Sequence, residues 1–533
     1  MGETSDQQRR SLAALAATPG WAGVCAASGM DDETAAAVLS AAGQLAEGVM
    51  IPLDVTADRE GCRMEGGRVR VPGAYHGAWA AYAAGGWIGL DLPEALGGSG
   101  LPVSLQAMAA QIFDRSCPAF NMATGASRSG AVLLAERAPD LAAEWVPALI
   151  AGERAATICI SEPGAGSDVG RLRTRAVRED GVWRVTGQKI WISFGDHDLV
   201  PRIGHCLLAR TSDQPGTRGI SLFLVPNLRA DGGDNGVTPV RIEEKMGLHG
   251  SPTCVLAFEG AEAHLIGEVD RGLPQLFTMI ELMRLQTGGQ GLGLATRACD
   301  VAEAYAQERA QGGDPRLPPV PIARHPDVQR QLAQMRARTE VLRAAVAELG
   351  CTMDLARADP AGRYPDAGAY AAFLLPLIKA FGAETGFDVA NRGIQVLGGA
   401  GYTAEWPLER AARDARVLSI YEGTTGMQAL DFLERRTVKD RAGLDAFLSR
   451  AEALEGPGAE VITRFAALAR ALPGALPDGR LWIADDWLRC GWLALTALLA
   501  PRVAQWDATA AEAATAQIVE RFEVHASAVR AAL

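Results

Sequence analysis

The feature that most constrains the fold is a change in hydrophobic periodicity along the 533-residue chain. Residues 1–150 are rich in Ala and Leu, and their apolar residues recur at the three- and four-residue steps of a helix. Residues 151–267 instead contain short β-favouring runs, such as TICI at 157–160 and GVWRVTGQKIWIS at 181–193. We therefore expect an α+β protein with a helical N-terminal domain over 1–150 and a central β domain over 151–267.

Helical patterns return after residue 267 and dominate the rest of the chain. Runs with apolar residues at helical spacing occupy 273–307, 328–349, 370–397 and 424–436. The first two runs are separated by GGDPRLPPVPIARHPD, which is too rich in Pro to be helical and predicts a long connecting loop. These patterns predict a helical domain over 268–437 and an appended helical unit over 438–533.

Composition and charge argue against several classes of protein. A formal net charge of -12 disfavours a general nucleic-acid or anionic-membrane surface, because phosphate binding depends on Lys and Arg. The nine cysteines stand singly, without a Cys-x-x-Cys pair, so we expect neither a metal site nor disulfides, in keeping with a reducing cytoplasm. The N-terminus lacks a hydrophobic signal core, and the apolar window Trp487–Ala500 is too short to span a bilayer. We expect a cytoplasmic protein with Trp487–Ala500 as a core helix.

Four segments could carry a binding function, and each also has a purely structural interpretation. SEPGAGSD at 161–168 is either a tight turn or a loop that offers backbone amides and hydroxyls to a polar ligand. KIWIS at 189–193 places an indole and a hydroxyl on one side of a strand, although Trp in a strand is usually core. QVLGGAGY at 395–402 is explained by a helix end, and GQGLG at 289–293 by close helix packing or a bulky ligand.

The segment LSIYEGTTGMQ at 418–428 contains a single carboxylate, Glu422, between an apolar, strand-like approach and a Gly-Thr-Thr turn. In an apolar setting the pKa of this carboxylate would rise, which suits a general base at neutral pH. The alternative is a role at a helix N-terminus, where Glu is favourable and Thr424 or Thr425 could cap. The local pattern by itself favours the cap.

Together, the segments resemble the acyl-CoA dehydrogenase flavoprotein family, and they occur in the family's order. The matching motifs are PEALGGSG at 93–100, CISEPGAGSD at 159–168, GQKIWIS at 187–193, RLQTGGQGLGLA at 284–295, QVLGGAGY at 395–402 and RDARVLSIYEGTTGMQ at 413–428. The resemblance covers about 80–437. It implies a helical N-terminal domain, a β-barrel-like middle domain and a C-terminal four-helix bundle, with FAD held between the last two and across a subunit interface.

The resemblance implies that Glu422 is the catalytic base of an α,β-dehydrogenation. The base would remove the α-proton of an acyl-CoA while hydride passes from the β-carbon to flavin N5, which gives a trans-2-enoyl-CoA. The implied FAD contacts are Ile158, Ile160, Ser161, Gly166, Ser167, Trp191, Ser193, Arg309, Gln311, Gln395, Gly398, Gly399 and Thr424. The implied substrate contacts are Ser167, Arg284 and Gly423.

Further detail of the resemblance concerns substrate and partners. ERAQGGDP at 308–315, the Pro-rich loop and the appended unit are similar to the longer bacterial branch that includes 3-(methylthio)propanoyl-CoA dehydrogenases. This similarity implies a short, medium or thioether-substituted acyl-CoA, an electron-transfer flavoprotein as partner, and a homodimer or homotetramer. The alternatives on the same fold are a flavin oxidase or monooxygenase and a DNA-binding alkylation-response flavoprotein. Mixed acids and bases over 440–533 disfavour the last of these.

Overall fold

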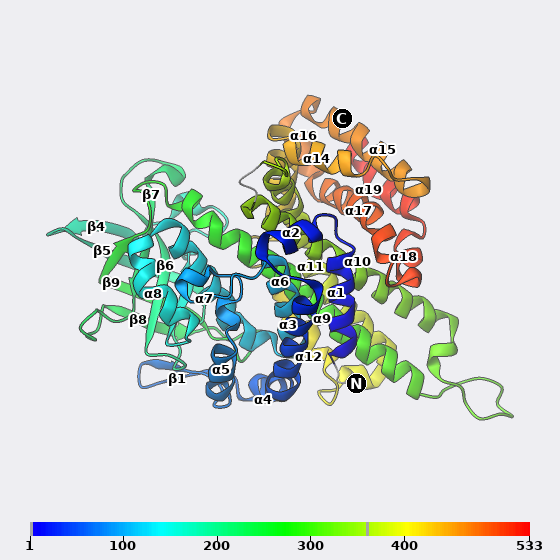
Figure 1. Cartoon of the computed structure of the whole chain (residues 1–533), viewed down its shortest axis with the longest axis horizontal. Helices are drawn as coiled ribbons and strands as arrows, with labels where there is room; N and C mark the ends of the chain where they lie inside the picture. The colour runs from blue at the N-terminus through cyan, green and yellow to red at the C-terminus, as the bar shows by residue number, and fades with distance from the viewer. Residues whose placement is uncertain (1–3, 359–361) are drawn as a thin grey trace. The chain divides into compact units, whose positions relative to one another are not determined.

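The computed structural model describes residues 4–358 and 362–533, which form two compact units (Figure 1). The first unit contains Met1–Gln44, Pro102–Arg115 and Arg284–Leu533, and the second contains Leu45–Leu101 and Ser116–Met283. Each unit is therefore assembled from stretches that are far apart in the sequence.

The second unit is built around a seven-stranded mixed sheet. Its strands are β3 (Arg154–Cys159), β4 (Arg175–Glu179), β5 (Val182–Ser193), β6 (Arg202–Arg210), β7 (Ile220–Pro226), β8 (Val237–Ile242) and β9 (Thr253–Leu265). The pairings β6-β4-β5-β9-β7 close into a ring because β7 also pairs with β6, while β3 and β8 add to β6 and β9. Leu207, Phe223 and Leu256 are fully buried in its core. These pairings agree with the expected barrel-like middle domain.

The second unit also contains helices. They are η1 (Ala46–Met50), α4 (Ile51–Glu60), α5 (Tyr75–Ala84), η2 (Trp87–Gly89), η3 (Glu94–Leu96), α7 (Pro118–Arg137), α8 (Pro139–Ile150), η4 (Val169–Arg171) and η5 (Gly216–Gly219). Helices α7 and α8 lie against β3. Strand β6 is buried over Ile203–Ala209, on both of its faces, as expected for a covered strand.

A small hairpin interrupts the predicted helical N-terminal region. Strands β1 (Arg63–Glu65) and β2 (Arg68–Arg70) pair antiparallel across Gly66 and Gly67, which both have positive φ. A two-residue turn with two positive φ angles matches the right-handed twist of a hairpin, and glycine adopts it without strain. This hairpin within the helical N-terminal region was not predicted from the sequence.

The first unit consists of helices, dominated by three long ones. They are α9 (Gly272–Glu308), whose first twelve residues belong to the second unit, α10 (Pro326–Ala358) and α11 (Ala367–Leu397). The shorter ones are α1 (Ser5–Ala16), α2 (Trp21–Ser28), α3 (Asp32–Leu45), α6 (Val103–Ser116), η6 (Ile322–Arg324), η7 (Gly398–Tyr402), α12 (Leu408–Arg416), η8 (Val417–Ser419), α13 (Thr425–Leu430) and η9 (Asp431–Lys439). The loop expected after α9 is present, because no helix lies between Glu308 and Ile322.

Glycines bring α9 directly against two other helices. A Cβ at Gly291 would lie 1.8 Å from the carbonyl oxygen of Gly382 in α11, and one at Gly293 would lie 2.5 Å from that of Gln111 in α6. Neither position has room for a side chain, since real Cβ atoms do not approach backbone this closely. Of the two interpretations of GQGLG, these contacts support close helix packing.

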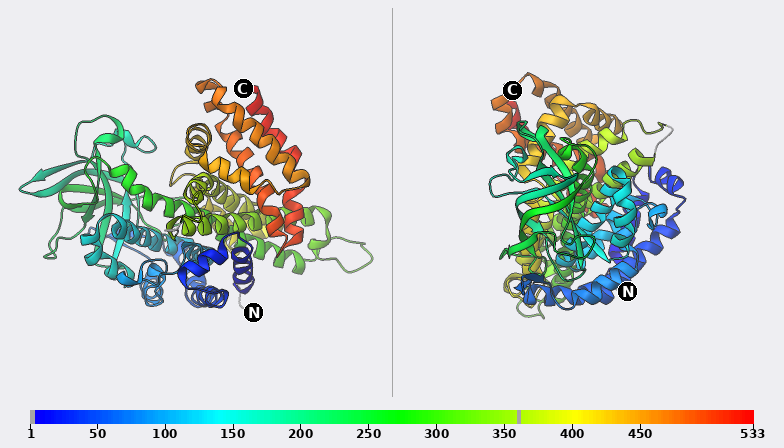
Figure 2. Two further views of the ribbon diagram at one scale, coloured as in Figure 1. Left: turned by 45° about the horizontal axis from the view of Figure 1, so that its top comes forward. Right: turned by 90° about the vertical axis from the view of Figure 1, so that its left-hand side faces the viewer.

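The appended helices pack together and against α10 and α11 (Figure 2, orange to red). They are α14 (Ala442–Arg450), α15 (Gly456–Ala471), η10 (Leu472–Gly474), α16 (Pro477–Trp482), α17 (Ala484–Val503), α18 (Ala508–Thr515) and α19 (Ile518–Ala531). The window Trp487–Ala500 lies in α17 with most of its side chains buried, so the prediction of a core helix is confirmed.

One helical run in the described part of the chain, Asp32–Glu60, is long and apolar enough to cross a membrane by length and composition. Of the residues in its most apolar window, 33% are buried. A single such run near the N-terminus is weak evidence, because core helices also meet this criterion.

Candidate active site

The backbone before Glu422 is helical rather than strand-like, so that expectation was wrong. Val417–Ser419 form the 3₁₀ helix η8, and Ile420 continues in the right-handed helical region. Helix α13 begins after Thr424, whose side-chain oxygen accepts a hydrogen bond from the backbone N–H of Met427 at 3.3 Å. Thr424 therefore satisfies the helix N-terminus, and Glu422 lies outside the cap.

Glu422 and Gly423 both adopt the left-handed conformation, with φ of 54° and 88°. A residue with a side chain loses about 1–2 kcal/mol in this region, so the surrounding structure must hold Glu422 in place. Gln428 Nε2 donates to the carbonyl oxygens of both residues at 3.2 Å, and Lys379 Nζ donates to that of Gly423. Lys379 and Gln428 are fully buried, so the two carbonyls are clamped by donors that water does not reach.

Burial and two nearby cations shift the pKa of Glu422 in opposite directions. Burial raises the pKa of the half-buried Glu422 carboxyl, and the nearby Arg284 and Lys379 partly oppose that rise. Burial also lowers the pKa of Lys379 to about 7, with Glu422 raising it and Arg284 lowering it. A carboxylate with a raised pKa, fixed backbone and adjacent cations is equipped to accept a proton near neutral pH.

Replacing Lys379 by methionine is expected to slow substrate-dependent flavin bleaching by about 10- to 100-fold, the effect of losing one charge-assisted hydrogen bond. In the dehydrogenation that the resemblance implies, the rate would rise with pH as the base, Glu422, loses its proton. Removal of a cation that lowers the pKa of Glu422 should therefore move the acid limb of the pH–rate profile to higher pH. Stopped-flow bleaching across pH measures both effects. Lys439→Met, at an exposed position, is the control, and an unmoved acid limb would contradict the assigned role.

The segments SEPGAGSD and KIWIS lie together in the second unit, joined by a buried ion pair. Lys189 Nζ is 2.7 Å from Glu162 Oε1 and donates to the carbonyl oxygen of Ile160 at 3.0 Å. The N–H of Ile190 donates to the carbonyl oxygen of Ser161 at 2.9 Å. Glu162 and Ala165 exchange backbone hydrogen bonds, which makes the segment a tight turn. Gly166 and Ser167 are exposed beyond this turn.

Trp191 has an unusual backbone and an exposed side chain. Its φ is 63°, the pairing of β5 with β9 shifts register between Lys189 and Ile192, and its side chain is 60% exposed. The expected regular strand is therefore broken at the indole, which removes Trp191 from the core. Ser193 and the isoleucines of β3 and its loop, Ile158 and Ile160, are half-buried. An exposed indole beside partly exposed hydroxyls is a fitting surface for a flat heteroaromatic ring such as a flavin.

The other predicted cofactor residues lie on the surface of the first unit. Arg309 and Gln311 are exposed in the loop after α9, where the Gln311 carbonyl oxygen is 2.7 Å from His325 Nε2. Gln395, Gly398 and Gly399 are exposed at the end of α11, and a Cβ at either glycine would meet nothing within 4 Å. These residues are open to a ligand or to another protein molecule.

The sequence-based predictions missed four buried residues that contact the 161–168 turn or the loop at Glu422 and Gly423, namely Glu162, Lys189, Lys379 and Gln428. A signal existed for the lysine of α11, since Lys379 is the one charge in FLLPLIKAFG. A lone charge in an apolar helix is rarely buried without a partner.

Comparison with known proteins identifies the family. Models of the acyl-CoA dehydrogenase N-terminal, middle and C-terminal domains match residues 32–153, 157–261 and 270–436. The chain belongs to the acyl-CoA dehydrogenase family. It is thus a member of a family of FAD-dependent oxidoreductases, and the expected fold class is confirmed. Residues after 436 lie outside the three domain models.

Named relatives are enzymes of this family. The chain is 37% identical to the 3-methylmercaptopropionyl-CoA dehydrogenase of Ruegeria pomeroyi over 84% of this chain and 75% of that protein. It is 34% identical to the broad-specificity linear acyl-CoA dehydrogenase FadE5 of Mycobacterium tuberculosis over 78% of this chain and 71% of that protein. An acyl-CoA dehydrogenase complexed with FAD from Bacillus anthracis shares the fold, with a TM-score of 0.73, 22% identity and coverage of 86% and 83%.

Proposed function

We propose that this acyl-CoA dehydrogenase uses Glu422 as the base that removes the α-proton of a short, medium or thioether-substituted acyl-CoA. The observation that carries the proposal is the clamped, left-handed backbone at Glu422 and Gly423, where burial raises the carboxyl pKa. Gly423 would lie beside the thioester, and a side chain at this position is excluded because a Cβ there would lie 2.7 Å from Gln428 Nε2. Arg284, whose charge also acts on Glu422, would hold the anionic CoA portion.

Residues of the 158–167 and 191–193 segments would hold the cofactor by ring stacking and by hydrogen bonds. Trp191 would pack on the isoalloxazine ring, and Ser161 and Ser193 would hydrogen-bond along its edge. FAD, when bound, supplies the acceptor for the substrate hydride. Ser167, Gly166, Ile158, Ile160 and Thr424 would complete the contacts from the same chain. Arg309 and Gln311 would contact the pyrophosphate region of FAD, while Gln395, Gly398 and Gly399 would reach the FAD of a neighbouring subunit. The exposure of all five residues supports these roles.

The proposal extends to domains, assembly and partners. We place the domain boundaries near 150, 267 and 437, which the limits of the three domain models support. A homodimer or homotetramer would supply the neighbouring subunit. An electron-transfer flavoprotein would accept the electrons, and the enzyme would work in the cytoplasm.

Anaerobic bleaching of the bound flavin tests the proposed substrate class. We expect bleaching within seconds by 3-(methylthio)propanoyl-CoA, butanoyl-CoA or octanoyl-CoA, with palmitoyl-CoA the slowest of the panel. Free coenzyme A, which has no α-proton, is the control. If no acyl-CoA in the panel bleaches the flavin, the proposed reaction is wrong. Rapid peroxide formation in air without another acceptor would assign the enzyme to the oxidases.

A further inference from the structure

The motif GQGLG at 289–293 places a polar residue, Gln290, inside a close helix crossing of the first unit. Its two glycine neighbours face the backbones of other helices. A Cβ at Gly289 would lie 3.9 Å from a backbone oxygen of α6, and one at Gly291 would lie 1.8 Å from the carbonyl oxygen of Gly382 in α11. Gln290 itself is only 2% exposed. Close packing explains the glycines, but it does not explain a buried polar side chain between them.

The side chain of Gln290 holds the residue that precedes the proposed base. Tyr421 donates its hydroxyl hydrogen to Gln290 Oε1, and Thr287, one turn earlier on α9, hydrogen-bonds the same hydroxyl. Gln290 and Thr287 are both buried. Breaking such a bond is costly, because each buried polar group that loses its partner keeps its desolvation penalty. The side chain of Tyr421 is therefore fixed to α9.

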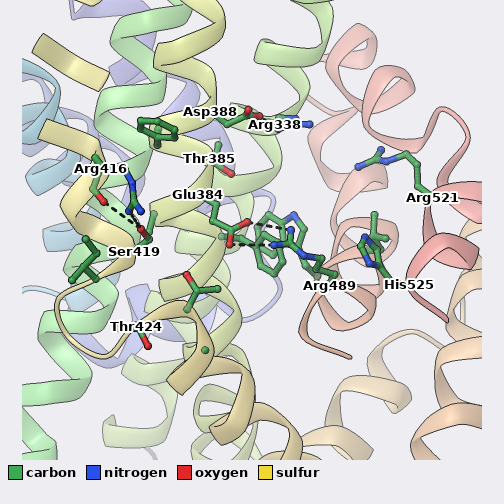
Figure 3. A pocket seen from close by; sticks show the side chains of 18 of the residues that line it. Arg338, Glu384, Thr385, Asp388, Arg416, Ser419, Thr424, Arg489, Arg521 and His525 are labelled. Atoms are coloured by element: carbon green, nitrogen blue, oxygen red, sulfur yellow. Dashed lines mark hydrogen bonds and ion pairs between the residues drawn. The ribbon is translucent and has the colours of Figure 1, made fainter. Parts of the chain in front are cut away.

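Another side of this loop, from Ile420 to Thr424 and here called the base loop, borders a cavity of about 920 Å³ (Figure 3). Ser419, Ile420 and Thr424 are among the residues that line the cavity, and Tyr421 is not. Figure 3 shows Ser419 and Thr424 along the wall that this segment forms. On this side the loop meets a space rather than packed side chains, so the contacts that hold it must come from its neighbouring helices.

Three helices contribute such contacts, and they act on both sides of the base. Lys379 of α11 and Gln428 of α13 hold the carbonyl oxygens of the two left-handed residues, which fixes the backbone at and after Glu422. Gln290 of α9 holds the residue before it, through Tyr421. The Cα–Cβ bond of a residue follows the two peptide planes that flank it. Contacts on both sides are therefore needed to aim the carboxylate of Glu422.

We propose that Gln290 is a positioning residue for the base, because it holds Tyr421 against α9 and so aims the carboxylate of Glu422. The proposal rests on the proposed role of Glu422. Gln290 is almost fully buried, so it would act through Tyr421 rather than by contact with the substrate. The glycines of GQGLG would then bring the helices together, and the glutamine between them would connect this crossing to the base loop.

Replacing Gln290 by leucine in the FAD-loaded enzyme tests the proposal, since leucine is similar in size but accepts no hydrogen bond. We expect the limiting rate of anaerobic flavin bleaching by butanoyl-CoA to fall about 10-fold, with an unchanged half-saturating concentration. Tyr421→Phe removes only the donor hydroxyl, so it should show a similar loss and tests the same bond if Gln290→Leu does not fold. The double variant should lose no more than the larger single loss.

The pH profile gives a readout that a general loss of stability would not move. Burial raises the pKa of Glu422, Arg284 of α9 and Lys379 of α11 oppose that rise, and the carboxylate of Asp114 in α6 acts on Tyr421. A loosened base loop would give the carboxyl more contact with water, so its pKa should fall toward the ordinary value of 4.5. The acid limb should then move to lower pH, opposite to the shift expected for Lys379→Met.

Hydrogen exchange followed by mass spectrometry examines the base loop without turnover. The peptide that contains residues 420–424 should exchange about 3- to 10-fold faster in Gln290→Leu. Tyr305→Phe is the matched control, because it removes a hydroxyl from the same helix at a ring that packs on Trp406, and it should behave like wild type in all three measurements.

Three outcomes would overturn the proposal: unchanged exchange in this peptide, an unmoved acid limb, or a raised half-saturating concentration at the normal limiting rate. The last of these would make Gln290 part of substrate binding. A wild-type enzyme that no acyl-CoA bleaches would instead refute the proposed reaction, and the exchange rates would still decide whether Gln290 anchors the base loop.

Discussion

Replacing Glu422 by glutamine is expected to slow flavin bleaching by acyl-CoA by roughly 10²- to 10⁴-fold, the usual contribution of a general base. Glutamine has nearly the same shape but cannot accept the α-proton. The hydrogen bonds that hold this loop use the backbone carbonyls of Glu422 and Gly423, so the fold and FAD binding should persist. Stopped-flow absorbance under anaerobic conditions measures the rate, and the flavin spectrum reports occupancy.

The wild-type pH profile gives an independent check on Glu422. The base works only when ionised, so the rate must fall as the pH drops through its pKa, and burial places that pKa above the ordinary value of 4.5. Glu405→Gln, at an exposed carboxylate of the same unit, is the control and should retain full activity. Near-normal bleaching by Glu422→Gln would refute the assigned base.

Replacing Lys189 by methionine is expected to destabilise the second unit by about 3–5 kcal/mol, because Glu162 would be left charged and buried without its partner. Despite burial, Lys189 lowers the pKa of Glu162, together with the N–H groups of Arg173 and Thr174. The stability from this shift is present above the ordinary pKa of 4.5 and is lost as the pH falls through the lower folded value. Urea unfolding followed by tryptophan fluorescence measures the loss.

A double variant separates the ion pair from the space that it fills. Glu162→Gln with Lys189→Met removes both charges and should recover much of the lost stability, since no lone charge remains buried. Arg171→Met, which removes an exposed pair with Asp168, is the control and should cost less than about 1 kcal/mol. A double variant as unstable as Lys189→Met would show that packing, rather than charge, accounts for the effect.

Much of the fold could be predicted from local patterns. The change from helical to strand periodicity placed the sheet, and the Pro-rich segment placed the loop after α9. The hairpin β1–β2 was missed although its Gly66-Gly67 pair is a strong turn signal, because only three residues on each side form the strands. Short elements give too few repeats for periodicity to detect.

The candidate site was predictable in its motifs but not in its geometry. Nothing local to KIWIS shows that Trp191 takes a left-handed φ, because that conformation follows from the register shift of β5 against β9. Likewise, Lys379 donates to the carbonyl oxygen of Gly423, 44 residues away in the sequence. This contact depends on how α11 packs against the loop that contains Glu422 and Gly423. Pairings at this separation are set by tertiary structure and leave no periodic trace.

The glycine contacts between α9 and α11 have a consequence for how this enzyme can change its substrate. Gly291 touches the backbone of Gly382, one turn of helix beyond Lys379, while Arg284 lies two turns before Gly291 on α9. With no side chains between them, the two helices are in direct backbone contact. Arg284 on α9 and Lys379 on α11, the two cations that act on Glu422, are therefore held in a fixed relation to each other. Even an alanine at Gly291 would push α9 and α11 apart and displace Arg284 and Lys379. Selection for a longer or bulkier acyl group must therefore reshape other walls of the site, and leave this crossing untouched.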